Sequence, residues 1–98
     1  MTLETFRQSL AEPTPPPGLT PAVEALWFDA KGDWETAHAR AQADEGRAGA
    51  WVHAYLHRKE GDASNAAYWY RRANQPVAAG PLESEWENVT KALLPPTA

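Results

Sequence analysis

A Gly-Asp pair occurs twice in this chain, at Gly32-Asp33 and again 29 residues later at Gly61-Asp62. Each pair lies between two stretches in which apolar residues recur every three or four positions, which is the spacing of an amphipathic helix. Glycine can adopt the left-handed conformation that ends a helix, and aspartate accepts hydrogen bonds from the first free amides of the next helix. Each pair therefore predicts a tight turn between two helices.

The repeat extends beyond the turns, because small and β-branched residues match at the same 29-residue offset. Such a match is typical of stacked helical hairpins, whose inward positions need small side chains. We therefore expect two tandem helix-turn-helix hairpins, over residues 21–45 and 46–76. The matching pairs are Val23 with Val52, Ala25 with Ala54, and Ala37 with Ala66.

The segments outside the hairpins also indicate helices. Residues 1–12 and 81–94 carry apolar side chains at helical spacing, and the proline-rich residues 13–20 favour an extended linker. Two hairpins alone would leave apolar surface open at both ends, so the terminal helices, or a second copy of the chain, should cover it. The sequence thus predicts one all-α domain over residues 1–98, with about six helices.

A family resemblance lies in three stretches: FDAKGDWETA at 28–37, HRKEGDASNA at 57–66, and AAYWYRRA at 66–73, which closes at Pro76. The two turn sequences resemble the centre of tetratricopeptide repeats, and the third stretch is similar to the second helix of Sel1-like repeats. The 29-residue spacing is shorter than the repeat of either family. The resemblance covers residues 22–76 and implies a helical repeat that binds proteins or peptides on a concave face.

Composition excludes several classes of protein. The chain has 98 residues, no cysteine and a net charge of -4. Without cysteine there are no disulfides, thiolate metal sites or cysteine nucleophiles, and the acidic balance argues against nucleic-acid binding. No apolar stretch is long enough to span a membrane, and the beginning of the sequence lacks the basic and apolar pattern of an export signal. We expect a cytoplasmic protein that binds neither nucleic acid nor membrane.

The second hairpin concentrates basic and aromatic residues in an otherwise acidic chain. Guanidinium groups bind carboxylates and phosphates through paired hydrogen bonds, and an aromatic ring can flank the ligand. The alternative is an ordinary polar helix face whose arginines pair with acids of the same protein. The leading interpretation is a non-catalytic module that binds a peptide, a protein or a small anionic group, with a preference for acidic partners. The predicted binding residues are Tyr55, Arg58, Tyr68, Arg71 and Arg72.

Histidines on the helix expected over 47–60 suggest a second function. His53, His57 and Glu60 follow the spacing i, i+4 and i+7, so they share one side of that helix and could bind a metal ion. The glutamate that follows the first histidine in helical zinc hydrolases is absent, and His38 is the candidate for a further ligand. A small metal-dependent or ligand-processing protein is therefore the alternative function, against a hydrogen-bonding or solvated histidine face. No catalytic residue and no cofactor are predicted.

Overall fold

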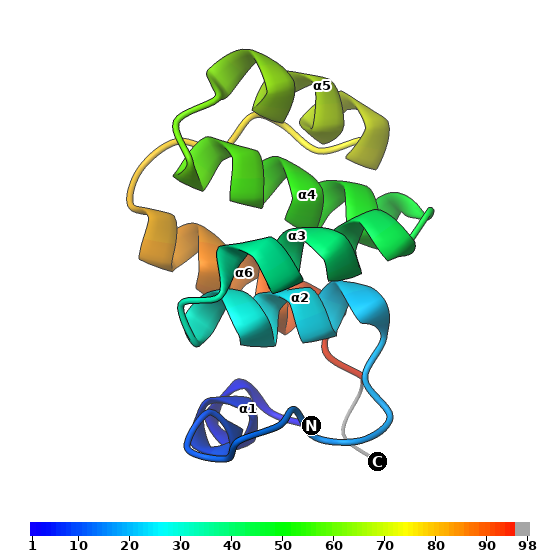
Figure 1. Ribbon diagram of the computed structural model, residues 1–98. Coiled ribbons are helices and arrows are strands. Elements are labelled where there is room, and N and C mark those ends of the chain that lie inside the picture. Colours follow the sequence, from blue (N-terminus) through cyan, green and yellow to red (C-terminus); the bar gives the residue numbers. More distant parts are fainter. Residues whose placement is uncertain (96–98) are drawn as a thin grey trace.

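The computed structural model describes residues 1–95, which form six helices and no strand. The prediction of an all-α protein with about six helices is confirmed (Figure 1). None of the helices in this range is both long and apolar enough to cross a membrane. The helices are α1 (Leu3–Ser9), α2 (Pro21–Ala30), α3 (Trp34–Ala43), α4 (Arg47–Lys59), α5 (Ala63–Ala73) and α6 (Leu82–Leu93).

Both predicted Gly-Asp turns form. Gly32 and Gly61 have φ angles of 84° and 90°, in the left-handed region that glycine enters without a steric penalty. Asp33 and Asp62 precede α3 and α5, and each carboxylate accepts a hydrogen bond from the backbone amide three residues further on. The repeated dipeptide therefore ends one helix and begins the next in both hairpins.

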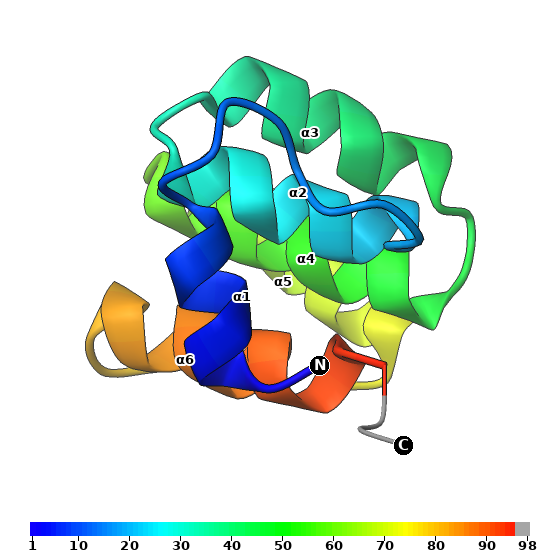
Figure 2. The same ribbon diagram turned by 90° about the horizontal axis from the view of Figure 1, so that it is seen from below.

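The two hairpins are α2 with α3 and α4 with α5, and α4 is the central helix of the molecule (Figure 1). It packs against α2, α3, α5 and α6, so it has no fully solvated side. The terminal helix α6 lies against α2 and α4, the first helix of each hairpin, and α1 packs on α6 (Figure 2). The terminal helices therefore cover the hairpins where their first helices meet.

The hydrophobic core is divided unequally between the two hairpins. The main cluster combines side chains of α1, α2, α3, α4 and α6, and includes Trp27 and Phe6, which are 1% and 0% exposed. A smaller cluster between α4 and α5 consists of Ala54, Ala66 and Tyr70. Because apolar burial is the main stabilising contribution, α5 is held less strongly than α2 by hydrophobic packing.

The proline-rich segment runs from the end of α1 to the start of α2 without a helix (Figure 2). Polar contacts hold its beginning. The ammonium group of Lys31 donates to the carbonyl oxygens of Leu10 and Glu12, at 2.7 and 3.1 Å. The indole nitrogen of Trp27 donates to the hydroxyl of Ser9 at 3.1 Å. These contacts join the end of α1 to α2, although no helix continues between them.

Candidate metal centre

All three histidines of the chain come together between α3 and α4. His38 belongs to α3, and His53 and His57 belong to α4. The Nε2 atoms of His38 and His53 are 2.9 Å apart. The ring centroid of His57 lies 4.8 Å from that of His53 and 5.2 Å from that of His38. One ring nitrogen from each histidine lies within 4.8 Å of those of the other two, so the three imidazoles surround one small volume.

Helix geometry explains this arrangement. His53 and His57 are four residues apart, so they lie one turn apart on the same side of α4. That side faces α3, because the short connection between the two helices packs them against each other. His38 lies on the side of α3 that faces α4, and it meets both histidines across the interface.

The close packing at the connection between α3 and α4 depends on Gly49. A Cβ atom at this position would lie 2.0 Å from the carbonyl oxygen of Asp44 and 2.6 Å from the Asp44 Cβ. Only glycine permits so close an approach of the backbone. Gly49 therefore lets residues 44–46 pack over the first turn of α4, next to the histidines.

Two tryptophans stack on the histidines. Trp34 lies nearly parallel to His38, with ring centroids 4.9 Å apart and planes inclined by 12°. Trp69 of α5 stacks on His53 at 3.9 Å and 17°. The indole nitrogen of Trp34 donates to the carbonyl oxygen of Leu56 at 3.0 Å, which fixes the orientation of that ring. The stacking restricts the rotation of both imidazoles and so preorganises them.

The third imidazole is oriented by polar neighbours. His57 Nδ1 lies 2.6 Å from a carboxylate oxygen of Glu60, and His57 Nε2 lies 3.4 Å from the side-chain amide nitrogen of Asn65. A carboxylate only accepts hydrogen bonds, so Nδ1 of His57 carries the proton in its contact with Glu60. Nε2 of His57 accepts from the Asn65 amide, so a metal ion bound at this atom would replace the contact with Asn65.

The surroundings of His38 and His53 favour their neutral forms. Burial lowers the pKa of His53 to about 4, and the positive charges that His38 and His57 would carry lower it further in the same direction. Burial also lowers the pKa of His38, with a smaller contribution from His57 and an opposing one from Glu60. Neutral imidazole is the form that binds metal ions, so His38 and His53 have the required charge at neutral pH, and an ion would replace the hydrogen bond between their Nε2 atoms.

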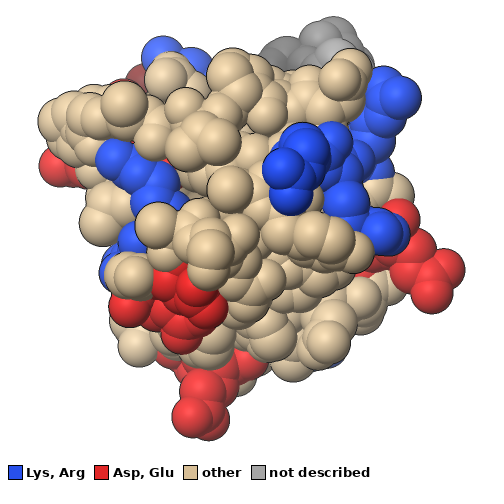
Figure 3. Space-filling model, turned by 90° about the horizontal axis from the view of Figure 1, so that it is seen from above, with Lys and Arg blue, Asp and Glu red and all other residues tan. Residues whose placement is uncertain are grey.

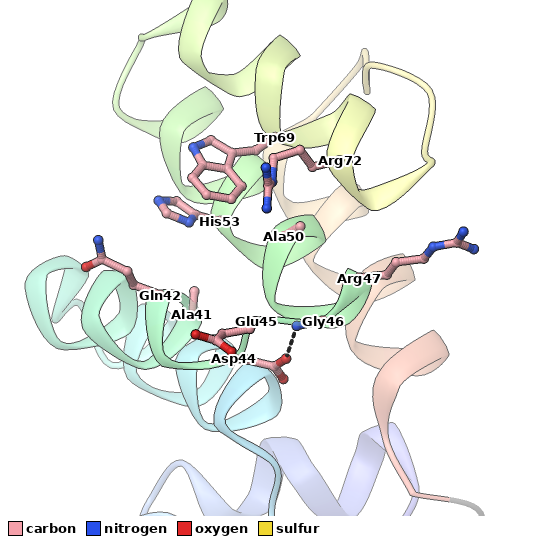
Figure 4. A pocket seen from close by; sticks show the side chains of 10 residues that line it. All are labelled: Ala41, Gln42, Asp44, Glu45, Gly46, Arg47, Ala50, His53, Trp69 and Arg72. Carbon is pink, nitrogen blue, oxygen red and sulfur yellow. Dashed lines mark hydrogen bonds between the residues drawn. The ribbon is translucent and has the colours of Figure 1, made fainter.

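A groove of about 590 Å³ opens beside His53, between α5 and the connection from α3 to α4 (Figure 4). The side chain of Arg72 points into this groove, whereas that of Arg47 points away from it. Trp69 belongs both to the groove and to the stack on His53. The groove therefore leads from solvent to one side of the histidine cluster. It is lined by Ala41, Gln42, Asp44, Glu45, Gly46, Arg47, Ala50, His53, Trp69 and Arg72.

Two of the five predicted binding residues do not belong to an exposed surface. Tyr55 is 2% exposed, and its hydroxyl donates to Asp29 at 2.9 Å. Arg58 is mostly covered and forms an ion pair of 2.9 Å with Glu85, a buried acid of α6. Both residues are on α4, whose central position directs them toward neighbouring helices. The predicted surface is therefore corrected to exclude them.

The other three predicted binding residues are exposed on α5. Tyr68 is 45% exposed, and Arg72 donates a hydrogen bond of 3.2 Å to its hydroxyl. Arg71 and Arg72 are both exposed. Figure 3 shows the side of the molecule that carries α5, where basic side chains form separate groups with uncharged surface between them. The exposed part of the predicted site is therefore limited to these three side chains of α5.

The predicted metal ligands are brought together in part. His53 and His57 converge, but Glu60 lies at Nδ1 of His57, and the third imidazole of the cluster comes from His38. A solvated histidine face is excluded, because His53 and His57 are 3% and 7% exposed. The hydrogen-bonding face that the sequence also allowed agrees with the contacts of His53 with His38 and of His57 with Glu60. The sequence named His38 as the candidate for a further ligand, and the structure places its ring nitrogen beside those of His53 and His57.

Comparison with protein-family models, curated proteins and solved structures finds no match to this chain. The resemblance to tetratricopeptide and Sel1-like repeats therefore stays a prediction that rests on the residues around the two turns. The function has to be inferred from the site itself, since a helical fold hosts many activities.

Proposed function

We propose that this protein binds a divalent transition metal ion through His38, His53 and His57. The observation that supports this function is the convergence of the three imidazoles. Two nitrogen ligands of a tetrahedral Zn²⁺ ion, each at about 2.0–2.1 Å from it, lie roughly 3.3 Å apart. The Nε2 atoms of His38 and His53 are 2.9 Å apart, so a small outward shift would accommodate the ion.

The ligand set favours zinc or a similar ion with an open coordination position. Imidazole nitrogen binds Zn²⁺, Cu²⁺ and Ni²⁺ well, whereas Mg²⁺ and Ca²⁺ prefer oxygen ligands. Structural zinc sites use four protein ligands, whereas three histidines leave the fourth position for water or a ligand. The groove beside His53 would give such a ligand access. We place this activity in the cytoplasm, in line with the cysteine-free sequence.

The contact between Glu60 and His57 also supports the proposal. A metal-binding histidine usually donates its other ring N–H to a carboxylate or carbonyl, which fixes the ring and makes it a stronger ligand. Glu60 provides this contact to His57. His57, Glu60 and Asp62 also lie close together. That second group is less suitable, because the Asp62 carboxylate already accepts a hydrogen bond from the backbone amide of Asn65.

Titration calorimetry with Zn²⁺ on chelator-treated protein tests the proposal. We expect one ion per chain. The zinc affinity should be at least about 100-fold weaker in His38→Gln and in His53→Gln, since each removes one of three ligands. Glu60→Gln should lower the affinity roughly 10-fold, because it disturbs only the orientation of His57.

The matched control is Arg40→Gln, an exposed position on α3 that does not line the groove and whose side chain lies over Phe28 of α2. It should leave zinc affinity unchanged, and circular dichroism should show the same helical content for all variants. If correctly folded His38→Gln and His53→Gln bind zinc as tightly as the parent chain, the three histidines are not the site.

A second candidate function is recognition of an acidic peptide by the exposed side of α5. It is supported by Tyr68, Arg71 and Arg72, which are all exposed there. Arg71 does not line the groove beside His53, so Arg71→Glu separates the two functions. Binding of a fluorescently labelled glutamate-rich peptide should be lost in Arg71→Glu while zinc affinity is retained. Unchanged peptide binding, or none in the parent chain, would contradict this candidate.

A further inference from the structure

We propose that the groove beside the histidine cluster binds a small monocarboxylate, with its carboxylate placed between Arg72 and the open position of the metal ion. The inference rests on the metal-binding function proposed above and adds its ligand. His53 and Trp69 belong both to the cluster and to the groove, so a molecule in the groove lies next to the metal site.

Arg72 supplies the cationic side of this groove. Its guanidinium carbon lies 5.3 Å from the centre of the Trp69 ring and 5.7 Å from that of Tyr68. A hydrogen bond of 3.2 Å to the Tyr68 hydroxyl fixes one end of the group. The aromatic contacts hold the guanidinium in place without neutralising its charge.

Arg72 also differs from the arginines that stabilise the fold. Arg7 pairs with Glu87 and Arg58 with Glu85, whereas no carboxylate of residues 1–95 lies within ion-pair distance of Arg72. A planar guanidinium binds a carboxylate through two parallel hydrogen bonds. Arg72 is therefore available for an anion that enters the groove.

The charges across the groove restrict that anion. Asp44 and Glu45 line the groove opposite Arg72, at the connection between α3 and α4 (Figure 4). Asp44 is fixed by a hydrogen bond of 3.0 Å from the backbone amide of Gly46. These two acids would repel a doubly charged phosphate, but they tolerate a single negative charge that lies against Arg72. The remainder of the ligand should therefore be neutral or positively charged.

Titration calorimetry on the zinc-loaded protein with three probes tests the ligand class. Propionate should bind, whereas propionamide, which has the same shape without the charge, and inorganic phosphate should bind at least about 10-fold more weakly. Equal binding of propionate and propionamide, tighter binding of phosphate, or no binding of propionate would overturn the proposal.

Matched variants test the role of Arg72. Arg72→Gln should lower propionate affinity about 10-fold or more, because it removes the paired, charge-assisted hydrogen bonds. Arg47→Gln is the control, since Arg47 lines the same groove but points away from it, and propionate affinity should not change. Glu45→Gln should raise the affinity roughly threefold by removing a repelling charge.

Zinc affinity measured on the same variants separates this inference from the function on which it rests. All three variants should bind zinc as the parent chain does, because none changes a histidine, the Glu60 carboxylate that orients His57, or Gly49. If zinc binds through the histidines while Arg72→Gln and Arg47→Gln affect propionate equally, the ligand proposal is refuted and the metal-binding function stands. If zinc does not bind through the histidines, the metal-binding function itself has failed.

Discussion

Gly49→Ala should lower the free energy of unfolding by about 3 kcal/mol, because the added methyl group has no space. Its Cβ would lie 2.0 Å from the carbonyl oxygen of Asp44, and a backbone atom cannot move aside as the end of a side chain can. The first turn of α4 and residues 44–46 would have to separate. Since His38 and His53 are on the two helices joined there, zinc affinity should fall as well. Urea denaturation followed by circular dichroism measures the change in stability.

Gly46→Ala is the matched control for this prediction. A Cβ at Gly46 meets only a side-chain oxygen of Asp44, at 3.3 Å, and Gly46 has an ordinary φ of -85°. Its substitution should cost no more than about 1 kcal/mol, the usual effect of changing a residue that precedes a helix. Equal unfolding midpoints for the two variants would show that the close approach at Gly49 is not needed.

Acidification should destabilise the metal-free protein through its buried histidines. The pKa of His53 falls from 6.5 to about 4 on folding, so below about pH 6.5 the unfolded chain takes up a proton that the folded chain does not. The contribution of the neutral His53 ring to the free energy of unfolding is therefore fully present above this pH, and it is lost as the pH falls toward about 4. His38, whose pKa is also lowered, contributes in the same direction. Between about pH 7.5 and about pH 4.5, we expect a loss on the order of 2 to 3 kcal/mol.

Urea denaturation across this pH range, with chelator present, measures the effect. His53→Phe is the informative comparison, because phenylalanine keeps a flat ring against Trp69 without a titrating nitrogen. His57 and Glu60 remain as ionisable neighbours in both proteins, so the difference between the two pH profiles belongs to the His53 ring and its interaction with His38. Parallel pH profiles for the two proteins would show that His53 is not the source of the acid-induced loss of stability.

Local features of the fold could be predicted from the sequence, because local residues determine them. Gly32 and Gly61 lie in the left-handed conformation that ends a helix, and each following aspartate caps the next helix. The start of α2 is local in the same way, because the Thr20 side chain accepts a hydrogen bond from the Val23 amide and a proline occupies the first turn. These signals act over a few residues and hold in any tertiary context.

The candidate site could be predicted only in part, because it is assembled across helices. Helical spacing brought His53 and His57 together, but the meeting with His38 depends on how α3 packs on α4. The same reason accounts for Tyr55 and Arg58, which the sequence placed on a binding surface. Their partners Asp29 and Glu85 are 26 and 27 residues away along the chain. Spacing along one helix carries no information about such contacts.

The location of the histidines gives a bound ion a mechanical role. His38 belongs to the first hairpin, and His53 and His57 belong to the second, so an ion held by all three would be a cross-link between the two hairpins. The chain has no cysteine with which to make such a link covalently. Unlike a disulfide, this link would form and open with the supply of metal rather than with the redox state. The rigidity of the paired hairpins would then rise and fall with the concentration of free metal around the protein.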